Sequence, residues 1–111
     1  MTVRTLHLVV LAALLTIGAS ELQANSSKPN IEAGKKLAEQ ACARCHAIGR
    51  DDDSALPMAP PLRTFAAKWP LDNLEEALAE GIVTGHADMP EFEFKPKQIM
   101  DLLSYIESVS P

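Results

Sequence analysis

Residues 42 to 46 read Cys-Ala-Arg-Cys-His and contain both cysteines of the 111-residue chain. Two thiols at this spacing can form thioether bonds to the two vinyl groups of one porphyrin, which leaves the next side chain, His46, placed to ligate the iron. The spacing followed by histidine is the attachment signature of a c-type haem. We therefore expect one haem c, covalently attached through Cys42 and Cys45, with His46 as an axial ligand of the iron.

Two neighbouring cysteines have three other common uses, which remain alternatives at this point. A disulfide would close only a very small loop and would gain little stability from the lost chain entropy. A redox dithiol uses the same spacing within a βαβ pattern, and we find no such pattern. A zinc site needs four well-spread ligands, whereas His46 is directly beside Cys45.

The first 24 residues have the pattern of a secretory signal peptide. Arg4 precedes an apolar stretch over residues 6–17, and small residues follow it. The stretch is shorter than the roughly 20 residues of a membrane-spanning helix. We expect cleavage after Ala24 and a periplasmic location. Cleavage after Ser20 or Ser26 is an alternative, and a retained signal would anchor the protein in a membrane.

Removal of residues 1–24 would leave 87 residues, which is enough for one domain. We expect a flexible leader over residues 25–30 and a single domain over residues 31–111. Since a domain of this size with only five aromatic side chains has a marginal core, a large covalent filler such as haem would stabilise it. We expect a monomer.

The net charge limits the possible partners. Without the first 24 residues the chain has 9 basic and 14 acidic side chains, a net charge of −5. Such a balance argues against nucleic-acid binding. We expect redox proteins with basic docking patches as partners, with slower association at high salt, and no stable insertion in a membrane once the signal is cleaved.

Helical periodicity predicts an all-α domain with three main helices, over residues 31–45, 70–80 and 96–109, with Pro70 as the first residue of the second. Asn30 is a suitable N-cap for the first helix, and Pro96 suits the first turn of the third. Each helix has an apolar stripe, and the stripe of the first includes Cys45. We expect the first helix to deliver the cysteines to the core.

Long loops are predicted between these helices. Residues 46–69 have no periodicity and contain prolines and a glycine, which indicates an extended loop. We expect the aspartates at 51–53 to be simply solvated. Gly81 ends the second helix, and residues 82–95 form another loop. Residues 91–94 alternate like a strand, but four residues without a partner segment cannot make a sheet.

The iron needs a second axial ligand from the opposite face of the ring. The candidates are Met58, His86, Met89 and Met100. We favour Met89, because it is in an aperiodic loop and Pro90 biases it towards an extended backbone. His86 would give a bis-histidine site of lower potential. Met58 follows His46 too closely for an easy turn around the ring, and Met100 is most simply a packing residue of the third helix.

Other residues are expected around the haem. A ligating histidine usually donates its second ring N–H to a carbonyl, and Pro60, in a rigid proline-rich stretch, is our choice for that acceptor. Arg63, Lys68 and the indole N–H of Trp69 are candidates to bind the haem propionates. Each has an ordinary alternative role: Pro60 would stiffen the loop, Arg63 and Lys68 would be surface charges, and Trp69 would pack in the core.

The chain resembles a small class I cytochrome c over nearly the whole predicted domain. Gly34 stands eight residues before Cys42, as in that family, and Leu102 with Tyr105 matches the Leu-x-x-aromatic pair of the last helix. Pro60-Pro61-Leu62 matches the family's proline-leucine element, and Met89-Pro90 matches its axial methionine. The chain departs from the pattern at Ala38, where the family commonly has an aromatic residue.

The stretch Gly-His-Ala-Asp-Met-Pro-Glu-Phe at residues 85–92 resembles compact bacterial monohaem members. The resemblance implies a cytochrome c fold around one haem c with His46 and Met89 as axial ligands, and electron transfer rather than enzyme catalysis. Two other functions remain open. One is a haem enzyme or gas sensor in which Met89 dissociates, and the other is a cytochrome subunit of a larger dehydrogenase.

Overall fold

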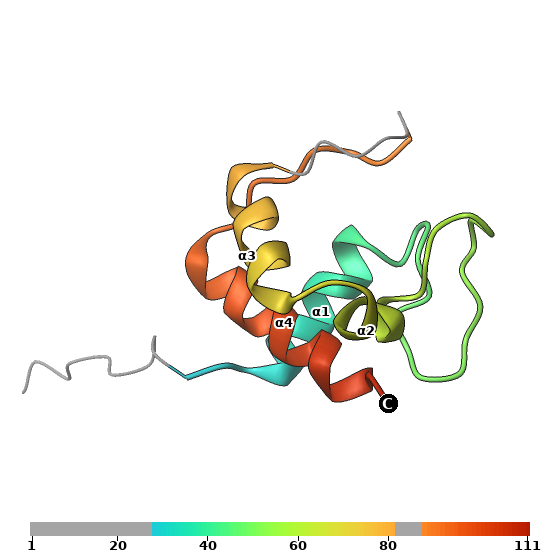
Figure 1. Ribbon diagram of the computed structural model, residues 1–111, viewed down its shortest axis with the longest axis horizontal. Coiled ribbons are helices and arrows are strands. Elements are labelled where there is room, and N and C mark those ends of the chain that lie inside the picture. The colour runs from blue at the N-terminus through green and yellow to red at the C-terminus, as the bar shows by residue number, and fades with distance from the viewer. Residues whose placement is uncertain (1–27, 82–87) are drawn as a thin grey trace, which may run out of the picture.

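The chain folds into helices joined by loops in the part that the computed structural model describes, residues 28–81 and 88–111. Its elements are α1 (Ile31–Ala41), the 3-10 turn η1 (Leu62–Thr64), α2 (Phe65–Lys68), α3 (Leu71–Glu80) and α4 (Pro96–Val109) (Figure 1). The all-α prediction is confirmed. The predicted signal peptide over 1–24, the leader residues 25–27 and His86 lie outside the described residues.

Helix α1 begins as predicted and ends earlier than predicted. The Asn30 side chain accepts a hydrogen bond from the Ala33 amide at 3.0 Å, which confirms its N-cap role. The helix ends at Ala41, so the prediction that it continues through Cys45 is wrong. The chain instead turns tightly, with the Cys45 amide donating to the Cys42 carbonyl at 3.1 Å, and the haem motif is a turn after the helix.

The prediction of an extended loop over residues 46–69 is wrong at its C-terminal end. Residues 62–68 form η1 and then α2. Pro61 starts this segment, because its carbonyl accepts from both the amide and the hydroxyl of Thr64, at 3.0 and 2.8 Å. The two successive prolines are therefore the start of a short helical segment.

The second and third predicted helices are confirmed as α3 and α4, although Pro70, predicted as the first residue of the second helix, is the N-cap of α3. Helix α3 ends at Gly81, whose φ of +91° suits a residue without a Cβ. Helix α4 begins at Pro96, and the Lys95 amide donates to Gln98 Oε1 at 2.9 Å. Residues 91–94 form no strand, as predicted, and the Phe94 amide bonds the Leu78 carbonyl at 3.0 Å.

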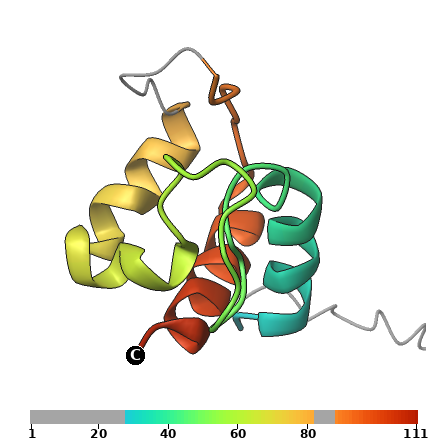
Figure 2. The same ribbon diagram turned by 90° about the vertical axis from the view of Figure 1, so that its right-hand side faces the viewer.

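Helices α1 and α4 cross in direct contact at Gly34. A Cβ built there would be 2.0 Å from the Asp101 carbonyl oxygen and 2.9 Å from the Tyr105 Cβ, so only glycine allows this crossing. Ala38, at which the chain departs from the pattern that it resembles, is fully buried. Figure 2 shows α4 between α1 and α3, so the last helix is the element on which the others pack.

A buried carboxylate fastens the start of α1 to α4. Asp101 is 6% exposed, and its Oδ1 accepts from the Asn30 amide at 2.7 Å and from the Lys97 ammonium. Both partners are donors, so the buried charge is satisfied. Among the described helices, none has the length and apolar character needed to cross a membrane.

Candidate haem site

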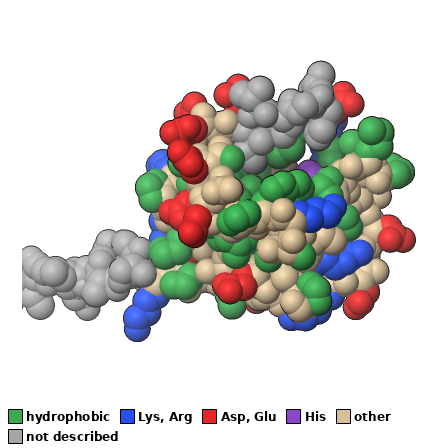
Figure 3. Space-filling view, in the orientation of Figure 1, with side chains coloured by type: hydrophobic (Ala, Val, Ile, Leu, Met, Phe, Trp, Pro, Cys, Tyr) green, Lys and Arg blue, Asp and Glu red, His purple; other side chains and the backbone are tan. Residues whose placement is uncertain are grey.

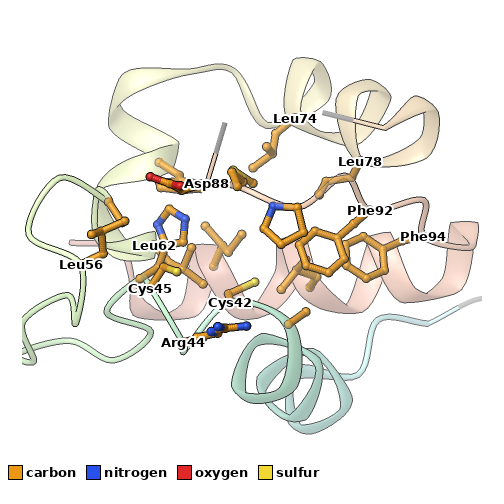
Figure 4. A pocket seen from close by; sticks show the side chains of 18 of the residues that line it. Cys42, Arg44, Cys45, Leu56, Leu62, Leu74, Leu78, Asp88, Phe92 and Phe94 are labelled. Carbon is orange, nitrogen blue, oxygen red and sulfur yellow. The ribbon is translucent and has the colours of Figure 1, made fainter. Parts of the chain in front are cut away.

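A cavity of about 480 Å³ opens between α3, α4 and the turn at residues 42–46. Its lining is mostly apolar, and its volume falls within the range of small-molecule and cofactor sites. Figure 4 shows Leu74 and Leu78 of α3 on one side of it and Cys42 and Cys45 on the other. The two cysteines therefore face an apolar helix surface across the cavity.

The ends of the cavity differ in character. Phe92 and Phe94 are stacked at one end, with ring centroids 5.4 Å apart and planes 9° apart (Figure 4). Leu56 and the carboxylate of Asp88 line the other end in the same view. One end is thus closed by aromatic rings, whereas the other contains a charged group.

Both cysteines are free thiols that line the cavity. Burial raises the pKa of the Cys42 thiol to about 11, so as a free thiol it is protonated at neutral pH. A redox dithiol needs a stabilised thiolate, and this environment does the opposite. Among the residues that the structure describes, no group of three or more His, Cys, Asp or Glu is placed to hold a metal ion.

His46 is 9% exposed and has one ring nitrogen already engaged. Its Nδ1 is 2.7 Å from the carbonyl oxygen of Pro60, the acceptor that the sequence suggested. Because a carbonyl can only accept, Nδ1 carries the proton, and Nε2 keeps a free lone pair for a metal. The ring of Phe65 packs edge-on against the imidazole, with centroids 5.8 Å apart.

The four ligand candidates separate by position. Met89 is half-buried and lines the cavity together with His46. Met58 is 87% exposed, and neither it nor Met100 on α4 lines the cavity. His86 lies outside the described residues. Of the three methionines that the structure describes, only Met89 lines the cavity that also contains the two cysteines.

The residues predicted to bind propionates do not line the cavity. The Arg63 guanidinium donates to the Asp52 carbonyl at 2.8 Å instead. Trp69 is 46% exposed and packs edge-on against Phe65, and the Lys68 ammonium is 5.9 Å from the Trp69 ring centroid. Their contacts in this structure are with the protein, and their propionate roles stay predictions.

Sequence reasoning missed some residues of the site. Phe65 contacts His46, but the prediction of a loop over 46–69 hid it; its i, i+4 spacing from Trp69 was the available signal. Phe92 was seen only as part of a short alternating stretch. Leu74 and Leu78 were part of a predicted apolar stripe, although that stripe alone does not reveal a cavity.

The donor set fits haem c. The cavity wall provides two free thiols, an imidazole with an available Nε2 and a thioether, and apolar side chains supply the rest of the enclosure. Thiols suit covalent attachment, and imidazole with thioether is an established axial pair for haem iron.

Comparison with known families gives the same answer. The sequence profile of the family described as Cytochrome c matches residues 31–110, which is most of the chain. A comparison with curated proteins finds no match. The family match implies a haem c that is used in electron transfer, and the Cys-x-x-Cys spacing at residues 42–45 is compatible with its attachment. The chain belongs to the cytochrome c family.

Proposed function

We propose that the chain is a one-electron carrier with a single haem c, attached through Cys42 and Cys45, whose iron is ligated by His46 and Met89. The observation that carries this proposal is the position of Met89. It lines the same cavity as His46 although the two residues are far apart in the sequence. A cavity with one available donor on each of two separate segments suits a six-coordinate iron.

The residues of the cavity would set the properties of the site. When bound, haem c supplies an Fe(II)/Fe(III) couple. The Pro60 carbonyl holds the Nδ1–H of His46 and so fixes the ring and raises the basicity of Nε2. The thioether of Met89 and the apolar wall of Leu74 and Leu78 favour the reduced state, and hence a raised potential. If His46 and Met89 both ligate the iron, no open position would remain for a substrate.

The charge on α3 supports a choice of partner. Its exposed acidic residues are Asp72, Glu75, Glu76 and Glu80. No lysine or arginine occurs between residues 71 and 94, and Figure 3 shows a group of acidic side chains beside this helix. Since α3 is also one wall of the cavity, a redox partner with a basic docking patch would be steered towards that side.

We also propose export and a single domain. Residues 1–24 would direct the chain to the periplasm, and the family match over residues 31–110 agrees with a domain that starts near residue 31. The proposed electron donors and acceptors are therefore periplasmic or membrane-bound proteins.

A redox titration of the purified full chain tests the function. We expect a reversible one-electron transition, and haem that stays with the polypeptide after denaturation. Carbon monoxide added to the reduced protein at neutral pH should bind slowly or not at all, because Met89 occupies the sixth position. Rapid stoichiometric binding of carbon monoxide would instead support the ligand-binding enzyme or sensor.

A further inference from the structure

The peptide that follows His46 is fixed by hydrogen bonds on both sides. The Ala47 amide donates to Ser54 Oγ at 2.9 Å, and the Ala47 carbonyl accepts from the Leu62 amide at 2.9 Å. The amide of His46 itself donates to the Cys42 carbonyl at 2.9 Å. The backbone on which the histidine is mounted is therefore bonded to the segment that follows Pro60 and Pro61.

One residue of the aspartate run organises the next part of this loop. Asp52 Oδ2 accepts from the Ile48 amide at 3.1 Å, and Oδ1 accepts from the Gly49 amide at 2.8 Å. All three aspartates are exposed, but of the three only the Asp52 side chain accepts hydrogen bonds from the described residues. The expectation that all three aspartates are simply solvated is wrong for Asp52, because its carboxylate closes the loop.

Gly49 is shaped for that carboxylate. A Cβ added at Gly49 would be 2.8 Å from Asp52 Oδ1 and 3.4 Å from its Cγ. Any side chain at this position would push the carboxylate away from the two amides. The lack of space for a side chain at Gly49 is thus a second observation, besides the hydrogen bonds, that places the Asp52 carboxylate here.

Arg63 joins the closed loop to the segment that contacts His46. Its NH1 donates to the Asp52 carbonyl at 2.8 Å, reaches the Gly49 carbonyl at 3.4 Å and is 3.7 Å from Asp52 Oδ1. Arg63 follows Pro60 by three residues, and the Pro60 carbonyl accepts from His46 Nδ1 at 2.7 Å. Because the ion pair is partly exposed, its attraction alone contributes little, and its importance is geometric.

We propose that Asp52 and Arg63 are positioning residues that hold the Pro60 carbonyl against His46 and thereby set the strength of His46 as an iron ligand. The inference rests on the proposed ligation of the iron by His46. A hydrogen bond to Nδ1 raises the basicity of Nε2 and stabilises the oxidised iron. When the contacts of Asp52 and Arg63 are lost, the midpoint potential of the iron rises and the Nδ1 proton of His46 exchanges faster with water.

The test compares single aspartate variants of the full-length holoprotein. Asp52→Asn, Asp51→Asn and Asp53→Asn each remove one negative charge from adjacent positions, so their effects on the potential through charge alone are similar. In the reduced protein, NMR measures how fast the His46 Nδ1 proton exchanges with water. We expect Asp52→Asn to speed this exchange by about fivefold, the factor that corresponds to one hydrogen bond of ordinary net strength. Its midpoint potential should also rise above those of the other two variants.

Two further variants separate geometry from charge. Gly49→Ala displaces the carboxylate without changing any charge, and it should reproduce the faster exchange and the higher potential. Arg63→Gln removes a positive charge, which by itself lowers the potential, yet it should speed exchange as Asp52→Asn does. The double variant Asp52→Asn, Arg63→Gln should exchange no faster than the more affected single variant, because residues that act as one unit are not additive.

Equal exchange rates in Asp52→Asn, Asp51→Asn and Asp53→Asn would overturn the inference, and so would strictly additive effects in the double variant. Failure of the proposed function would give a different NMR result. In that case the His46 resonances of the unmodified protein would show no ring-current shift from an adjacent porphyrin, before any variant is compared.

Discussion

The two sides of α4 are built differently. On the α1 side, Gly34 lets the two helix backbones touch, and Ala38 and Tyr105 are almost completely buried. On the α3 side, Leu74 and Phe92 are only half-buried and line a cavity of about 480 Å³. The first side is closed by the chain's own side chains, whereas the second has its apolar surface arranged around a space of cofactor size.

This difference indicates how the fold depends on haem. The contact between α1 and α4 needs no additional group, because its buried charge and its backbone ends already have partners. The cavity side loses its apolar contacts if nothing fills it, and apolar side chains around an empty space contribute less stability. The cofactor thus completes one half of a small core.

The largest effect is expected from His46→Ala. We expect no stable holoprotein, since the variant lacks the ligand that fixes the iron in the cavity, and the apoprotein should have reduced helix content by circular dichroism. Cys42→Ala or Cys45→Ala should weaken covalent attachment. Ala43→Ser, within the same motif but not on the cavity wall, is the control and should retain its haem. Complete folding of the apoprotein would contradict the dependence on haem.

The contact side is tested by Gly34→Ala. The new methyl group would meet the Asp101 backbone, which cannot move without shifting α4, so we expect a loss of about 3 kcal/mol in the free energy of unfolding. Denaturant unfolding of the holoprotein measures it. Glu39→Ala, an exposed position on α1, should change stability by less than about 0.5 kcal/mol. If both variants were equally stable, the two helices would not be in close contact.

Met89→Ala tests the cavity side without removing haem. The haem should stay attached, the midpoint potential should fall, and added imidazole should bind more tightly. If Met89 occupies its position about 99% of the time, its loss tightens apparent binding by about 100-fold, because apparent affinity follows the open fraction. Titration with imidazole measures this change. Met58→Ala removes an exposed methionine and is the control; an effect as large there would point to Met58 as the ligand.

The smallest effect concerns the contact of α4 with the loop after His46. Tyr105, the only tyrosine, donates its hydroxyl to the Ile48 carbonyl at 2.8 Å. Burial and then the nearby Asp52 carboxylate raise its pKa. The neutral phenol is thus favoured in the folded state, and its contribution to stability is lost as the pH rises above the unfolded pKa of about 10. Tyr105→Phe should cost about 1 kcal/mol at neutral pH.

An ultraviolet titration of the protein, with Tyr105→Phe as the baseline, follows the phenol directly. Ionisation above the ordinary range is the expected result. A phenol that titrates at or below its ordinary value would mean that Tyr105 is not held against Ile48.

The sequence was sufficient for features that local chemistry determines. Asn30 and Pro96 mark the starts of α1 and α4 because an N-cap and a first-turn proline have specific backbone requirements. Gly34 was found by its spacing from Cys42 within the family resemblance. The position of the Pro60 carbonyl beside His46 also followed from what a ligating histidine requires.

Features that depend on tertiary contacts were missed. Residues 62–68 have too short an apolar pattern to indicate a helix, and they become helical because Pro61 accepts from Thr64. Asp52 differs from Asp51 and Asp53 through its contacts with two amides and with Arg63, which no composition or spacing shows. Arg63 was predicted to face the haem, but the loop carbonyls that it bonds are visible only in the folded chain.

The most direct test of the central claim is the optical spectrum of the purified, oxidised full-length protein. Ligation by His46 and Met89 predicts the weak charge-transfer band at the red end of the spectrum that sulfur ligation gives to ferric haem, and predicts its loss in Met89→Ala. A spectrum without that band in the unmodified protein, or a band that survives in Met89→Ala, would contradict the account.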